Sequence, residues 1–114
     1  MAAAMSTQMF AIVPVVAGGP SGTVTVTASG SSVRYHVVVT GLAPGSLHTI
    51  HDHLGRCSSA GSSEHLTVLA TPAANGEGVI DFQTTVGPFL AGAGRIVIVY
   101  SNAIANLITG CADL

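Results

Sequence analysis

Four of the five histidines of this 114-residue chain, His48, His51, His53 and His65, fall within eighteen positions. Side chains two residues apart in a strand point the same way, so His51 and His53 would project from one face. Two imidazoles at that spacing form a good chelate for copper, zinc or nickel. The sequence therefore predicts a metal site at His51 and His53, with His65 as third ligand because it follows shortly after Cys57.

Two neighbouring residues are expected to support this site without touching the ion. His48 has the opposite strand parity to His51 and His53. It would hydrogen-bond to the backbone and hold its loop. Asp52 lies between the two ligands and points to the other face, either as a partner behind them or as a solvated charge.

The elements that position these residues show a period of two, which is typical of half-buried strands. Gly, Pro, Asn and Ser turns separate them at the spacing of a sandwich or barrel, and no long window is amphipathic in the way a helix is. The expected strands cover residues 8–16, 23–27, 33–40, 47–53, 66–71, 79–85, 95–100 and 107–112, and the Ile/Val-rich strand 95–100 is expected to be buried on both faces. The sequence predicts one all-β domain over residues 9–114, an eight-stranded antiparallel Greek-key sandwich or flattened barrel, preceded by a tail of residues 1–8.

Charge is unusually scarce in this chain. Only 7% of residues are charged, none is Lys and the formal net charge is −2, against about 25% charged in an average soluble domain. Nucleic acid is not expected as a partner because phosphate binding needs clustered cations. The apolar run 9–17, interrupted by Pro14, is shorter than the roughly 20 residues of a membrane-spanning segment. A surface with so few charges is either solvated by Ser and Thr hydroxyls or buried in a homo-oligomer or array, and we expect at least a dimer.

Cys57 and Cys111 are the two cysteines, and they either form a disulfide or remain as thiols in a reducing compartment. The segment 41–61, GLAPGSLHTIHDHLGRCSSAG, resembles the Gly-Leu…Gly-x-His-Gly-Phe-His-x-His segment of copper–zinc superoxide dismutases, with the Cys and Ala-Gly that follow it. The segment 94–99, GRIVIV, resembles a later strand of that family. The resemblance covers roughly residues 10–114.

This resemblance implies a superoxide dismutase-like fold in which His51 and His53 bind copper and His48 is structural. It implies a Cys57–Cys111 disulfide, and with it an extracytoplasmic location, whether periplasmic, secreted or at the cell surface. It also favours copper, with zinc as a single ion the alternative.

The chain departs from the family in its loops. Between Cys57 and the next strand it has one histidine, His65, and no suitable aspartate, so a second metal is not expected. Tyr100 stands where the family has its last copper histidine and is a possible fourth metal group. No arginine just before the second cysteine guides an anion, which leaves only Arg56 and Arg95 to assist its approach.

Three functions remain open from these patterns. The chain is a copper-dependent superoxide dismutase, a non-catalytic metal-binding domain, or a structural or assembly protein on the same fold with a vestigial metal site. A haem role also stays open because His and Tyr are both axial ligands, although no Cys-x-x-Cys-His motif is present. We expect a divergent superoxide dismutase-like domain that binds one transition metal, with weak or no dismutase activity.

Overall fold

Runs of alternating polar and apolar residues form several of the strands in the computed structural model, which describes residues 6–104 and 107–114. The described residues form eight β-strands and one short 3₁₀ helix: β1 (Ser6–Pro14), β2 (Ser21–Ser29), β3 (Ser32–Thr40), β4 (Ile50–Leu54), η1 (Cys57–Ser62), β5 (Glu64–Ala70), β6 (Ile80–Val86), β7 (Arg95–Ser101) and β8 (Leu107–Asp113). This confirms the predicted all-β fold.

Two expected boundaries differ from the structure. β1 begins at Ser6 because Ser6, Thr7 and Gln8 pair with β2, so they are not tail residues; residues 1–5 of the expected tail lie outside the described residues. The expected strand 47–53 is shorter, because the chain up to Thr49 is held by single contacts, such as an isolated bridge from Leu47 to Ala73, and not by a ladder.

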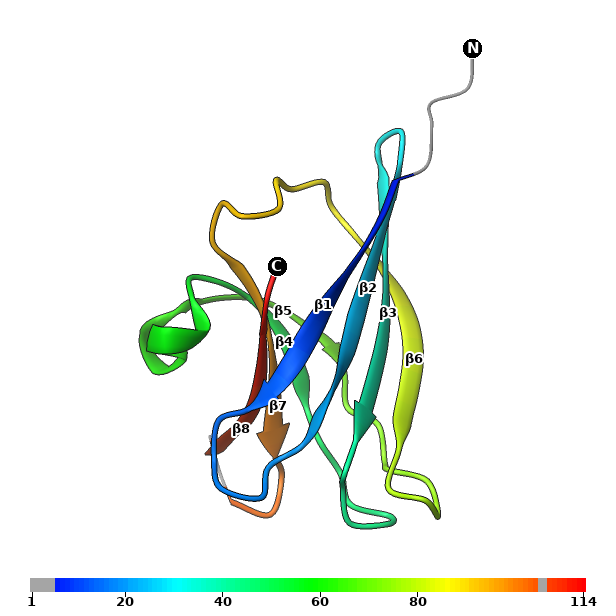
Figure 1. The fold of residues 1–114 in the computed structure, drawn as a ribbon, viewed down its shortest axis with the longest axis vertical. Helices are drawn as coiled ribbons and strands as arrows, with labels where there is room; N and C mark the ends of the chain where they lie inside the picture. Colours follow the sequence, from blue (N-terminus) through cyan, green and yellow to red (C-terminus); the bar gives the residue numbers. More distant parts are fainter. Residues whose placement is uncertain (1–5, 105–106) are drawn as a thin grey trace.

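The strands form one antiparallel sheet in the order β5-β4-β7-β8-β1-β2-β3-β6. Figure 1 shows this sheet curled into a nearly closed barrel, with β1, β2, β3 and β6 as one half and β5, β4, β7 and β8 as the other. β1 joins the halves, since it pairs with β2 along most of its length and with β8 only at Val13 and Pro14. The two strands that end the order, β5 and β6, are the edges of the barrel.

The barrel is filled by the inward-facing side chains of both halves. In β3 the residues Val33, Tyr35, Val37 and Val39 are all buried, and the residues between them face outward. In β7, Val97 and Val99 belong to the same core. Burial of such apolar side chains stabilises the fold by roughly 1.5–3 kcal/mol each.

A second, smaller core lies outside the barrel, under η1. There Ala60 and the disulfide-bonded Cys57 and Cys111 pack on Ile96 and Ile98 of β7. Both the predicted disulfide and the predicted burial of β7 on both faces are therefore confirmed. No helix among the described residues is long and apolar enough to span a membrane.

Candidate metal centre

The strand β4 presents His51 and His53 on the outside of the barrel. Its alternate residues Ile50 and Asp52 are fully buried on the inner side. The His51 Nδ1 and His53 Nε2 atoms lie 3.3 Å apart. The two rings are nearly parallel, with an interplanar angle of 14°, so strand parity brings both imidazoles to one place.

A β-bulge in β5 adds His65 to this pair. Asp52 pairs with Thr67, but the next residue, His53, pairs with His65, so Leu66 is skipped. In a regular ladder His53 would oppose Leu66, and His65 would point to the other face. Bulges of this kind redirect side chains. As a result, ligand atoms of His51, His53 and His65 all lie within 4.8 Å of one another.

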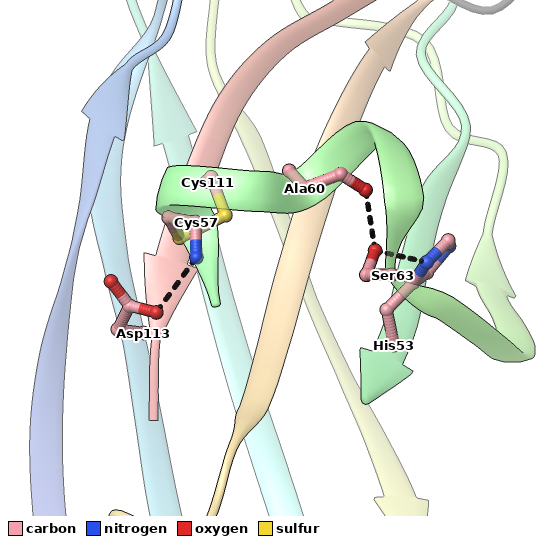
Figure 2. The surroundings of a disulfide bond; sticks show 6 residues. All are labelled: His53, Cys57, Ala60, Ser63, Cys111 and Asp113. Carbon is pink, nitrogen blue, oxygen red and sulfur yellow. Dashed lines mark hydrogen bonds between the residues drawn. A yellow bond between two sulfur atoms is a disulfide. The ribbon is translucent and has the colours of Figure 1, made fainter. Parts of the chain in front are cut away.

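Ser63 fixes the proton of His53. The Ser63 hydroxyl donates to the carbonyl oxygen of Ala60 in η1, and its Oγ lies 2.9 Å from His53 Nδ1 (Figure 2). Since that hydroxyl has donated its hydrogen, Oγ accepts from His53 Nδ1–H, which leaves the lone pair on Nε2. A hydrogen bond to the other ring nitrogen is how proteins orient ligand histidines.

Gly55, just after β4, allows this close approach. Its φ is +143°, and a Cβ at this position would lie 2.9 Å from Ser63 Cβ. A side chain here would displace Ser63 from His53. The local backbone therefore requires glycine.

Tyr100 lies beside the three histidines. Its ring centroid is 4.7 Å from that of His51 and 6.5 Å from that of His53. Burial raises the pKa of the Tyr100 phenol, so the hydroxyl stays protonated near pH 7. At the site Tyr100 is a neutral hydroxyl.

His48 lies in the loop before β4, and its ring nitrogens are not among the ligand atoms that converge at the site. Its Nδ1 lies 2.8 Å from the Tyr100 carbonyl oxygen, to which it donates, and its Nε2 lies 2.7 Å from Ser46 Oγ. Both ring nitrogens are therefore engaged within the protein. His48 holds the end of β7 that carries Tyr100.

The environment of His51 and His53 favours their neutral forms. Burial is the main cause that lowers the pKa of His51 and of His53, and the positive charge that nearby His65 would carry when protonated lowers both further. Metal ligands must be deprotonated. Imidazole ligands suit Cu or Zn, and they do not suit the oxygen-seeking Mg or Ca.

The charged residues lie elsewhere than expected for an anion path. Arg95 was predicted to assist anion approach, but its guanidinium points to the inner side of the sheet and pairs with Asp52. Parity explains this, because Arg95 alternates with the inward-facing Val97 and Val99. Asp52 is accordingly no solvated charge. Arg56 donates to the backbone oxygen of Gly92.

Sequence reasoning missed Ser63 and the bulge at Leu66. Ser63 is one of several serines in residues 54–64, and no pattern separates it from the others. The bulge leaves no mark in the alternation of β5, whose residues are largely exposed.

No protein-family model and no curated protein matches the chain.

Proposed function

We propose that this domain binds a single transition-metal ion, copper in preference to zinc, through His51, His53 and His65. The observation that carries the proposal is the convergence of these ligand atoms within 4.8 Å. The Ser63 hydrogen bond supports it further, because it leaves the His53 Nε2 lone pair facing the other ligands. The choice of copper comes from the sequence resemblance to copper–zinc superoxide dismutases.

When bound, copper on imidazole ligands would supply one-electron redox chemistry. The chain's own residues would contribute orientation and little electrostatic attraction. Of the three arginines, Arg95 is paired with Asp52 and Arg56 bonds to Gly92, and Arg34 belongs to β3 in the other half of the barrel. Fast capture of an anion needs a positive field around the site. We therefore propose weak or no dismutase activity.

A second candidate is a structural or assembly role with a vestigial metal site. Large apolar side chains stand exposed in a surface with little charge, including Met9 at 68% and Leu90 at 76% of their full accessibility. Such side chains favour burial against further copies of the chain. Sedimentation at micromolar concentration would test this, and a clean 11 kDa species would contradict assembly.

The disulfide supports an extracytoplasmic location, periplasmic, secreted or at the surface, because disulfides persist in oxidising compartments. Metal analysis of protein folded under oxidising conditions with copper and zinc, then dialysed, tests the proposed function. We expect about one metal ion per chain. If the protein holds no metal, the proposed metal-binding function is contradicted, and the structural or assembly role takes its place. A superoxide assay on the copper-loaded protein then separates a dismutase from a non-catalytic metal-binding domain.

A further inference from the structure

An ion pair lies inside the barrel directly behind the metal site. Asp52 has no exposed surface. The Arg95 guanidinium forms a bidentate pair with the Asp52 carboxylate, with Nε 2.8 Å from Oδ1 and Nη2 2.5 Å from Oδ2. The Tyr35 hydroxyl donates to Oδ1 at 3.4 Å, and the Phe89 ring covers the guanidinium at 4.6 Å.

Stability alone is a poor reason for such a pair. Removing two charges from water costs several kcal/mol per ion, and apolar residues of similar volume are often as stabilising. The pair does, however, join β4 to β7 directly beside the ligand histidines. Asp52 is the residue between the ligands His51 and His53 of β4, and Arg95 begins β7.

The strand β4 needs a restraint at this point. Its ladder with β5 shifts register between Ile50 and His51 and again between Asp52 and His53, on both sides of the first ligand. β5 is also an edge strand with mostly exposed side chains. The ladder with β7 is regular over the same residues. β4 is therefore held firmly from the β7 side, where the ion pair is.

We propose that Asp52 is a positioning residue, clamped by Arg95 so that His51 and His53 keep their spacing and ring orientation for a metal ion. The proposal rests on the metal-binding function proposed above. The bidentate geometry matters more than the charge, because a planar fork fixes the carboxylate in position and in rotation. Rotation of the Asp52 side chain is coupled through the backbone to the two neighbouring ligands.

The test compares D52L/R95L, which replaces the ion pair with apolar side chains, and R95K, which keeps the charge and loses the fork. The matched control is H36L/D81L, which removes the pair joined by His36 Nε2 and Asp81 Oδ1 at 2.7 Å on an exposed part of β3 and β6. Three properties are measured: the unfolding midpoint, Cu(II) affinity with its EPR spectrum, and the imidazole ¹⁵N resonances of the metal-free protein.

We expect D52L/R95L to unfold near the wild-type midpoint but to bind Cu(II) about 10–100-fold more weakly, the usual effect of losing a group that orients a ligand. Its EPR spectrum and the His51 and His53 ¹⁵N resonances should change. R95K should fall between, and H36L/D81L should match the wild type. If the Asp52–Arg95 pair served only to stabilise the fold, D52L/R95L would keep wild-type metal affinity along with wild-type stability.

The proposal is overturned if folded D52L/R95L keeps wild-type affinity and wild-type imidazole resonances. If D52L/R95L does not fold, the same result in R95K overturns it. If the wild type binds no metal, the proposed function fails. The metal-free resonances then still test the clamp, and identical resonances in wild type and variants refute it.

Discussion

Breaking the Cys57–Cys111 disulfide should remove a large part of the stability of this domain. The bond spans a sequence separation of 54 residues, and for a loop of this length the chain-entropy model gives about 4 kcal/mol. A domain of this size unfolds with roughly 5–15 kcal/mol. Reduction should therefore consume between about a quarter and most of the free energy of unfolding.

The assay is urea unfolding of the wild type with and without a dithiol reductant, with C57A/C111A as the control that reductant cannot affect. We expect the midpoint of the wild type to fall on reduction and that of the variant to be insensitive. Loss of less than about 1 kcal/mol would refute the reasoning. Such a small loss would mean that other contacts already keep η1 attached to β8, such as the hydrogen bond from Cys57 N to Asp113 Oδ1 (Figure 2).

Three further predictions concern the metal site. S63A should weaken Cu(II) binding about 10–100-fold, measured by competition with a chelator, because His53 loses the partner that fixes its proton; S62A is the matched control. Deletion of Leu66 removes the extra residue of the bulge and should leave His65 opposite His53 in a regular β4–β5 ladder, so that Cu(II) EPR shows the same number of nitrogen ligands as the wild type; loss of a nitrogen ligand would contradict the role of Leu66 as the skipped residue. Acidification should release the metal and destabilise the metal-free fold. The folded-state pKa values of His51 and His53 lie below the unfolded value of about 6.5. The unfolded state therefore binds more protons, and the free energy of unfolding falls as pH drops from about 6.5 through the lowered values. Thermal unfolding of the metal-free protein from about pH 7.5 to about pH 5 measures this loss, and a midpoint that does not change with pH would contradict it.

The parts of the fold that follow from local alternation could be predicted from the sequence. A period of two marks strands such as β2 and β3. The shared parity of His51 and His53 follows from the same alternation in β4. The burial of β7 on both faces could be predicted from its Ile and Val residues. The disulfide could be predicted from the family resemblance.

The parts that depend on packing between distant segments could not be predicted. The Leu66 bulge is a property of the β4–β5 pair, and β5 alone shows only an ordinary strand pattern. Together with Arg56, Arg95 was predicted to assist the approach of an anion. Its inward position becomes favourable only with Asp52, which is 43 residues earlier in the chain.

Titration with Cu(II) and Zn(II) of the wild type, H51A, H53A and the control H36A tests the histidine site most directly. We expect the wild type and H36A to bind copper with a Kd below about 10 μM, or roughly 7 kcal/mol, and more tightly than zinc. H51A and H53A should each bind far more weakly. A wild type that binds neither metal in this range, or an H36A variant that loses binding as H51A does, would contradict a metal site at His51, His53 and His65.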